Sequence, residues 1–328
     1  MEMKNIAGYP KVTFIVCTYN CRENAKNCFT SIKEQDYPGE TELIASDGGS
    51  TDGTVELLES MGVKVLFNKE KYPEGRGRGK WLGYKNATGD IVIFIDSDNT
   101  LVEKTWLKEM VKPLVSDGSV NFCICRMVIV KTDKAINRYL SFIGTDPFVT
   151  DKSIDSLLAL GRLKLKDKGD YYTYKITKEN LILTSGFYFT IWKKNLDIIG
   201  GYTQDTDVVF NLAQKGIANV AIAKNAHVHH LVSDSIITFT KKKYWWADIY
   251  FRIQIHGRDF HWIPADRKGR LKIMLKIVKN FLFLPELVTG ARMSVRYREP
   301  AWLLHPVVVW LTTMSYVLAY LKNKISQG

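Results

Sequence analysis

Two acidic residues close the most apolar stretch of this sequence. Asp96 and Asp98 follow the run GDIVIFI, so they lie one residue apart at the end of an expected buried strand. Residues i and i+2 of a strand point to the same face, and two neighbouring carboxylates repel unless a cation lies between them. Mg²⁺ and Mn²⁺ favour oxygen ligands such as carboxylates and substrate phosphates. The pair, with Ser97 between its members, therefore predicts a site for a divalent metal ion and a diphosphate; a cap for a helix at 103–115 is the structural alternative.

Polar residues also follow two other expected strands. The apolar stretch at 11–19 ends with Thr18 and Tyr19 and is followed by Asn20, and the stretch TELIAS leads into SDGGSTDGT, which contains Asp47. The glycines of this segment permit a tight turn and a close approach of the backbone to a ligand. We expect Asp47 to accept hydrogen bonds from a base or ribose, and residues 51–52 to cap the helix that follows.

A third candidate segment, EGRGRGK at 74–80, combines three glycines with Arg76, Arg78 and Lys80. Glycine exposes backbone N–H groups, and cationic side chains match the charge of a diphosphate. A solvated charged loop would have the same composition. Because the segment precedes the strand that ends in Asp96, we favour phosphate contact, without choosing among the three cations.

A regular alternation of elements over the first 130 residues positions these segments. Apolar stretches typical of buried strands alternate with segments of helical spacing, as at Ala25, Cys28 and Phe29. The alternation predicts a parallel sheet with helices on both faces, and Cys123 and Cys125 are expected to be small buried side chains of one strand. Ligands of such sheets bind at the carboxyl ends of the strands, where the polar residues collect.

Several ordered motifs resemble those of the family-two glycosyltransferases, which have the GT-A fold. The resemblance covers residues 10–245 and rests on VCTYN, SDGGSTDGT, ATGDIVIFIDSDN, TSGFYFTIWKKNLDIIGGY, QDTDVVFNLAQKG and VHH. It implies an α/β fold with a Rossmann-like, mostly parallel sheet. It also implies that the first-strand motif and Asp47 hold the nucleoside of a nucleotide sugar. Asp96 and Asp98 would bind Mn²⁺ or Mg²⁺ and the sugar diphosphate.

The same resemblance places a catalytic base at Asp205, although this residue and Asp207 would also suit a helix cap. An inverting transfer needs one group to take the proton from the acceptor hydroxyl as it attacks the anomeric carbon. The usual Glu before this base is replaced by Gln204. The VHH motif implies a metal or diphosphate ligand at His230, with the neighbouring His229 left open. On the acceptor side the resemblance implies three further residues, which are Gly186, Trp192 and Gln204.

The C-terminal part is basic. The net charge is +12, and residues 241–300 alone hold 14 Lys or Arg against 5 Asp or Glu. Lysines stand beside Tyr and Trp in KKKYWW, a combination that suits a membrane interface. The segment at 269–290 places Arg270, Lys272, Lys276 and Lys279 on one helical side with apolar residues opposite, the pattern of an interfacial helix. We recognise no nucleic-acid-binding module, so an anionic membrane surface is the expected partner.

Residues 301–321 contain no Asp, Glu, Lys or Arg and are long enough to span a bilayer. Basic residues flank the segment on both sides, at Arg296 and Arg298 and at Lys322 and Lys324. Three interpretations stay open, which are a membrane span, a helix in the interface and a core helix. In the first two, the protein and a lipid-linked acceptor would share one surface.

These features predict a GT-A catalytic domain at 1–240 and a helical membrane-association region at 241–328. The predicted function is a metal-dependent inverting transfer of a sugar from a nucleoside-diphosphate sugar to a polyprenyl-linked acceptor. Five cysteines without a CxxC pair, and the absence of a recognisable secretory signal, favour the cytoplasmic face of the cell membrane. A nucleotidyltransferase and a non-catalytic nucleotide-sugar-binding scaffold are the alternatives, and Gln204 favours the scaffold.

Overall fold

The computed structural model describes residues 8–70, 76–183 and 188–325. The chain divides into two compact units, one formed by residues 1–128 and 164–230 and the other by residues 129–163 and 231–328. The units are therefore discontinuous in sequence, and helix α9 (Ile236–Arg252) of the second unit contains the predicted boundary at residue 240.

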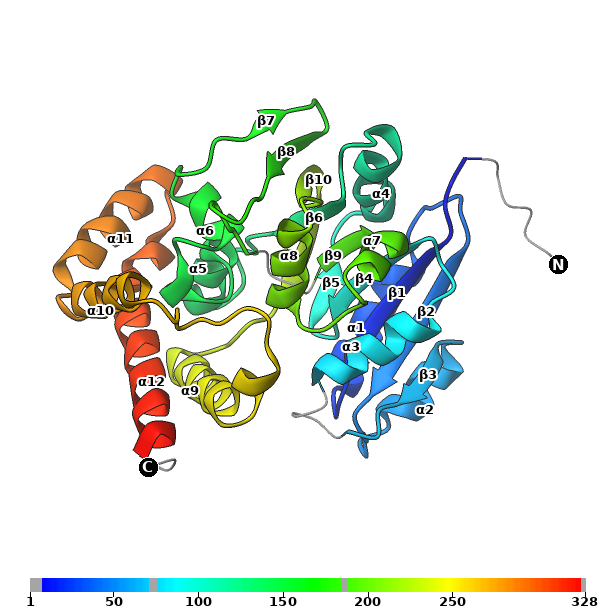
Figure 1. Ribbon diagram of the computed structural model, residues 1–328. Helices are drawn as coiled ribbons and strands as arrows, with labels where there is room; N and C mark the ends of the chain where they lie inside the picture. Colours follow the sequence, from blue (N-terminus) through cyan, green and yellow to red (C-terminus); the bar gives the residue numbers. More distant parts are fainter. Residues whose placement is uncertain (1–7, 71–75, 184–187, 326–328) are drawn as a thin grey trace. The chain divides into compact units, whose positions relative to one another are not determined.

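The first unit is built around a ten-stranded mixed sheet (Figure 1). Strands β1 to β4 run parallel to one another, β6 runs parallel to β10, and β9 lies antiparallel between β4 and β6. The mostly parallel α/β sheet was predicted, and the structure confirms it. Across the sheet the order is β3 (Lys64–Phe67), β2 (Thr41–Asp47), β1 (Val12–Thr18), β4 (Ile91–Asp96), β9 (Tyr188–Trp192), β6 (Phe122–Met127), β10 (Asn219–His230), β8 (Tyr171–Lys175) and β7 (Lys166–Asp167), and β5 (Asn99–Leu101) pairs with β10.

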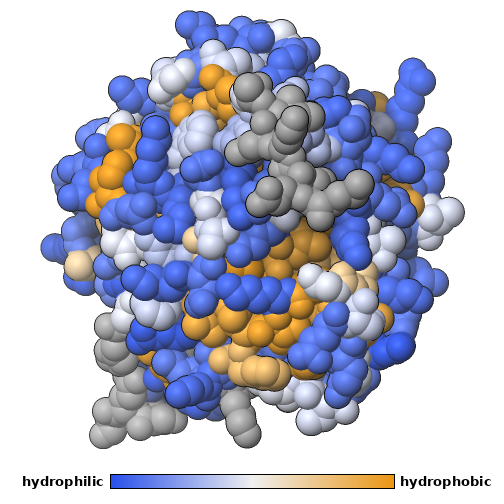
Figure 2. Space-filling model, turned by 90° about the vertical axis from the view of Figure 1, so that its right-hand side faces the viewer, coloured by the Kyte–Doolittle hydropathy of each residue, from blue (hydrophilic) through white to orange (hydrophobic). Residues whose placement is uncertain are grey.

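The central strands form because their residues are apolar throughout, which suits a sheet covered on both faces. Ile91 to Ile95 of β4 and most of β1 are buried. The predicted faces of the flanking helices are also buried, for example Ala25, Cys28 and Phe29 of α1, and so are Cys123 and Cys125. On the face that Figure 2 presents, hydrophilic side chains surround a smaller apolar area. The helices of this unit are α1 (Arg22–Lys33), α2 (Thr54–Ser60), α3 (Arg76–Asn86), α4 (Trp106–Ser116), α7 (Lys193–Ile198) and α8 (Asp205–Gln214).

Helix α3 begins within the glycine-rich segment at 74–80, which was expected to contact phosphate. Two of its glycines allow close packing against β1. A Cβ at Gly83 would lie 2.3 Å from Cγ2 of Ile15 in β1, and a Cβ at Gly79 would lie 3.0 Å from Sγ of Cys17. Residues 76–80 are therefore the first residues of a helix that lies close to β1, and the phosphate contact expected of this segment stays a prediction.

The second unit is helical. Its apolar core gathers Tyr139 and Leu140 from one helix and Met293, Trp302 and Val308 from three others. The apolar C-terminal segment is helical, and residues 300–325 are long and apolar enough to cross a membrane, although half of the apolar part of that stretch is buried inside the protein. The elements are α5 (Ala135–Ile143), η1 (Pro147–Val149), α6 (Ile154–Ala159), α9, η2 (Gln254–Gly257), α10 (Arg267–Phe281), α11 (Leu284–Tyr297), η3 (Pro300–Leu304) and α12 (His305–Ile325).

Candidate active site

The carboxyl ends of β1, β2 and β4 lie side by side, as the alternation of strands and helices predicts. Thr18 pairs in register with Asp47, and Cys17 pairs with Asp96. Parallel strands in register place their last residues at one edge of the sheet. The polar residues that end these three strands therefore share that edge.

Asp47 organises the loop after β2. It is fully buried, and one carboxylate oxygen accepts hydrogen bonds from the backbone N–H groups of Gly49 (2.9 Å) and Ser50 (2.7 Å). The other oxygen accepts from the hydroxyls of Thr18 (2.8 Å) and Ser50 (2.7 Å). Asn20, which has a positive φ of 44° that Asn tolerates, donates its backbone N–H to the Ser50 hydroxyl. These bonds tie the ends of β1 and β2 into one rigid turn.

Lys80 connects the acid that ends β4 to the first residue of α8. Its ammonium nitrogen lies 3.1 Å from Oδ1 of Asp96 and 3.0 Å from Oδ1 of Asp205. The Lys80 side chain is only 2% exposed, whereas Asp96 and Asp205 are 14% and 28% exposed. A buried ammonium is costly unless carboxylates compensate it. The ion network therefore fixes the positions of both acids while leaving part of each accessible.

Tyr202 completes this network, and no motif had singled it out as a site residue. Its hydroxyl donates to Oδ1 of Asp205, and the Lys80 ammonium lies 5.7 Å from the centre of its ring. Burial, and then the adjacent Asp205, raise the pKa of the Tyr202 phenol well above its ordinary value, so it stays a proton donor in this bond. In the sequence it is the last residue of the motif TSGFYFTIWKKNLDIIGGY and lies three residues before Asp205.

Gly77 makes the approach of α3 to this network possible. It lies three residues before Lys80 and so on the same side of the helix. A Cβ at this position would lie 2.2 Å from Nε2 of Gln204 and 2.8 Å from the carbonyl oxygen of Thr203. Gln204 therefore packs beside α3, directly before Asp205.

The second acid of the pair points toward a histidine. Oδ2 of Asp98 lies 3.3 Å from Nε2 of His230, whose side chain is 6% exposed. The antiparallel pairing of β5 with β10 sets His230 opposite Asn99, and the Asn99 amide donates to the other Asp98 oxygen at 3.2 Å. Neighbouring strand residues point to opposite faces, so His229 points away from this contact. Of the two histidines, the geometry favours His230.

Asp96, Asp98 and His230 supply only part of the ligands that a divalent metal ion needs. Over the described parts of the chain, no group of three or more His, Cys, Asp or Glu side chains is placed to hold a metal by itself. Asp98 and His230 offer one carboxylate and one imidazole, and Asp96 is engaged with Lys80. Mg²⁺ commonly takes one or two carboxylates and completes its coordination with substrate phosphates and water. An incomplete protein site of this kind fits an ion that arrives with a diphosphate.

Several predicted residues lie elsewhere. The Arg78 side chain is 65% exposed and lies 3.5 Å from Glu70, away from Lys80. Trp192 pairs with Ile91 at the opposite end of β4 from Asp96, and its indole N–H donates to the carbonyl of Leu114. This position separates Trp192 from the carboxylates.

Three further residues were predicted at the site, which are Tyr19, Ser97 and Gly186. Tyr19 is 41% exposed at the end of β1. Ser97 hydrogen-bonds the Cys21 thiol, whose pKa is raised by burial in spite of that bond. Gly186 lies outside the described residues.

Comparisons with known proteins agree with this architecture. The chain is 33% identical over 117 residues to the uncharacterized glycosyltransferase YfnE of Bacillus subtilis, a match that covers 35% of the chain and 29% of that protein. It is 31% identical over 98 residues to the GalNAc(5)-diNAcBac-PP-undecaprenol beta-1,3-glucosyltransferase of Campylobacter jejuni, covering 28% of the chain and 31% of that protein. The chain thus spans less than a third of either relative.

A solved structure shares the fold. The mannosyltransferase PcManGT from Pyrobaculum calidifontis, in complex with GDP-Man and Mn²⁺, superposes with a TM-score of 0.53 over 95% of this chain and 88% of that one, at 16% identity. The family model for glycosyl transferase family 2 matches residues 13–188, more than half of the chain. The chain therefore belongs to glycosyl transferase family 2.

Proposed function

We propose that the protein transfers a sugar, with inversion, from a nucleoside-diphosphate sugar to a polyprenyl-linked acceptor. The observation that carries this proposal is the Lys80 bridge, because it holds a metal-pair acid, Asp96, and a candidate base, Asp205, on one ammonium. Such a bridge sets the leaving diphosphate and the attacking hydroxyl close to one another. Proximity and orientation of this kind supply a large part of the catalysis of displacement reactions.

Asp205 is the proposed base. Its carboxylate takes the proton of the acceptor hydroxyl while that oxygen forms a bond to the anomeric carbon and the bond to the diphosphate breaks. Lys80 and the Tyr202 hydroxyl both bond Oδ1, so they fix the orientation of the carboxylate. Gln204 borders this base and is proposed to contact the acceptor.

Asp98 and His230, with Asp96, are the residues proposed to hold Mn²⁺ or Mg²⁺. The ion would neutralise charge on the leaving diphosphate. On the other side of the donor, the rigid turn around Asp47, Thr18 and Asn20 is proposed to receive the nucleoside. The turn offers a backbone already fixed by hydrogen bonds, so little conformational freedom is lost when a nucleoside binds.

The second unit supports a membrane acceptor. On α10, Leu271, Met274, Leu275 and Val278 are each more than half exposed, and their i, i+3, i+4, i+7 spacing places them on one side of the helix. An exposed apolar face beside basic residues is typical of a helix that lies in the membrane interface. We therefore assign membrane contact to α10 rather than to a span by α12. The relative in Campylobacter jejuni is named for an undecaprenol-linked substrate, which is consistent with this assignment.

Calorimetric titration of the protein with UDP-, GDP- and other nucleotide sugars, with and without Mn²⁺, tests the donor site. We expect one donor to bind in the presence of the ion and much less in its absence. Incubation of that donor with a polyprenyl-linked acceptor should then release a nucleoside diphosphate. Release of pyrophosphate would instead indicate a nucleotidyltransferase, and ion-dependent binding without turnover on any lipid acceptor would indicate a non-catalytic binder.

A further inference from the structure

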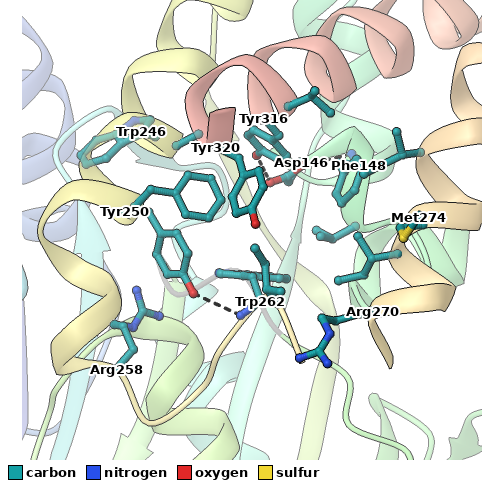
Figure 3. A pocket seen from close by; sticks show the side chains of 17 residues that line it. Asp146, Phe148, Trp246, Tyr250, Arg258, Trp262, Arg270, Met274, Tyr316 and Tyr320 are labelled. Carbon is teal, nitrogen blue, oxygen red and sulfur yellow. Dashed lines mark hydrogen bonds between the residues drawn. The ribbon is translucent and has the colours of Figure 1, made fainter. Parts of the chain in front are cut away.

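A cavity of about 470 Å³ lies within the second unit, a volume within the range of ligand-binding pockets. Its walls come from η1, α9, the segment after η2, α10 and α12, all of which belong to this unit. Figure 3 shows the aromatic rings of Trp246, Tyr250, Trp262 and Tyr320 around it. Ile273 and Ile277, one turn apart on α10, add aliphatic side chains to the lining. The lining is thus mainly aromatic and aliphatic.

Among its described lining residues, the cavity has more basic than acidic side chains. Two guanidinium groups, those of Arg258 and Arg270, lie on either side of Trp262 (Figure 3), and that of Arg270 donates to the carbonyl oxygen of Ala265. Asp146, the one acid among the described residues of the lining, accepts hydrogen bonds from the backbone N–H of Phe148 and from the Tyr316 hydroxyl. The cavity therefore combines apolar walls with an excess of positive charge. Guanidinium groups bind phosphate oxygens strongly, often through two hydrogen bonds.

The cavity is also continuous with the exposed side of α10. Met274 lines it and is 62% exposed, and it belongs to the same helical face as Leu271 and Leu275. A hydrocarbon chain entering from a bilayer would pass from this apolar face into an apolar interior. A nucleotide or a free sugar would leave its polar groups unpaired against the same walls.

We propose that this cavity binds a phosphorylated hydrocarbon chain, with the chain between α9, α10 and α12 and the phosphate at Arg258 and Arg270. The proposal concerns binding by the second unit, so it holds whether or not the first unit transfers a sugar. Isoprenoid and straight-chain phosphates share this chemistry, and the measurement separates them.

The test is a titration of the full chain, in detergent-free buffer, with farnesyl phosphate, dodecyl phosphate, farnesol and inorganic phosphate, followed by calorimetry and by tryptophan fluorescence. Trp246 and Trp262 line the cavity, so their emission should change when a chain enters. We expect both lipid phosphates to bind more tightly than farnesol, and inorganic phosphate to bind least. The tighter of the two lipid phosphates identifies the preferred chain.

Two sets of variants locate the site. Replacing both arginines, Arg258→Gln with Arg270→Gln, should weaken the binding of farnesyl phosphate by about tenfold or more. The affinity for farnesol should stay nearly unchanged, because only charge-assisted bonds are lost. Ile277→Trp, which would fill part of the cavity, should weaken the binding of both farnesyl phosphate and farnesol. Arg267→Gln, on α10 outside the lining, is the matched control. Equal binding of farnesyl phosphate and inorganic phosphate, or unchanged affinity in the double arginine variant with an unchanged thermal midpoint, would overturn the proposal.

Discussion

The Lys80 ammonium lies 3.0 Å from a carboxylate oxygen of Asp205, although 124 residues separate the two in the sequence. The same ammonium lies 3.1 Å from Asp96. A cation that was expected to contact phosphate is therefore placed as the link between two acids. It compensates two neighbouring carboxylates, which would otherwise repel each other.

Replacing Lys80 should lower the rate of sugar transfer more than the stability of the fold. We expect Lys80→Met to lower kcat/KM by about 100-fold or more, because Asp96 and Asp205 lose the group that orients them. Lys80→Arg should not restore activity, since a planar guanidinium differs in shape from the ammonium and the site has little spare volume. Lys85→Gln is the matched control, because Lys85 lies on the same helix, is exposed and is not among the residues expected to contact a ligand. Activity of Lys80→Met within a fewfold of the unchanged protein would exclude this role.

The proposed role of Asp205 as the base can be tested separately from donor binding. Asp205→Asn keeps the size and part of the hydrogen bonding of the side chain but cannot take a proton. We expect donor affinity within a fewfold of the unchanged protein and a fall in kcat of roughly 100- to 10,000-fold. Donor titration and product release, measured on one preparation, give both quantities. Comparable turnover in the variant would remove Asp205 from the mechanism.

The close packing of the α3 glycines predicts how Gly→Ala substitutions affect stability and activity. Gly83→Ala should lower the free energy of unfolding by roughly 1–3 kcal/mol, because its Cβ would lie 2.3 Å from the Ile15 side chain. Gly77→Ala should instead act on activity, since its Cβ would displace Gln204 beside the base. Gly118→Ala is the control, because nothing lies within 4 Å of a Cβ there. Urea unfolding of the three variants measures the first effect, and steady-state kinetics measures the second.

The common edge of β1, β2 and β4 could be predicted from sequence because it follows from local rules. Apolar strands that alternate with helices must run parallel, and their carboxyl ends then meet. The position of Trp192 could not be inferred in the same way. An apolar run does not reveal the direction of its strand, and β9 runs antiparallel to β4, which carries Trp192 to the far end.

Two other features depend on contacts between distant parts of the chain. Lys80 meets Asp205, the first residue of α8, through the packing of distant elements, which the spacing within one helix does not show. The membership of residues 129–163 in the helical unit depends on packing against residues 231–328, for example of Tyr139 on Trp302. Sequence periodicity describes one element at a time, so it predicted the helices but not their grouping.

The exposed face of α10 predicts reversible binding to anionic vesicles. The double variant Leu271→Ser with Leu275→Ser should reduce the partition coefficient by about tenfold or more, since each Leu contributes on the order of 1 kcal/mol when buried in lipid. Val115→Ser with Ile198→Ser, two residues of similar exposure in the first unit, is the matched control. Sedimentation with vesicles of stated anionic content measures both. Equal sedimentation of the two double variants would place the membrane contact elsewhere.

The second unit contains a buried acid whose ionisation should contribute to stability. Oε2 of Glu286 lies 2.9 Å from Nε2 of His305, whose Nδ1 in turn meets the Tyr139 hydroxyl, and Oε1 lies 2.9 Å from the Lys279 ammonium. Burial by itself would raise the pKa of Glu286, but the hydrogen bonds from His305 and Lys279 outweigh it and lower the pKa to about 2.

Because the folded protein holds the Glu286 pKa below its ordinary value of 4.5, the stabilisation is present above that pH. It is lost as the pH falls from about 4.5 toward about 2, where the folded form also takes up the proton. Glu286→Gln should therefore cost on the order of 2 kcal/mol of unfolding free energy near neutral pH and much less near pH 2. Urea unfolding of both proteins at several pH values gives this difference directly. A difference that stays constant with pH would mean that Glu286 stabilises the unit through packing alone.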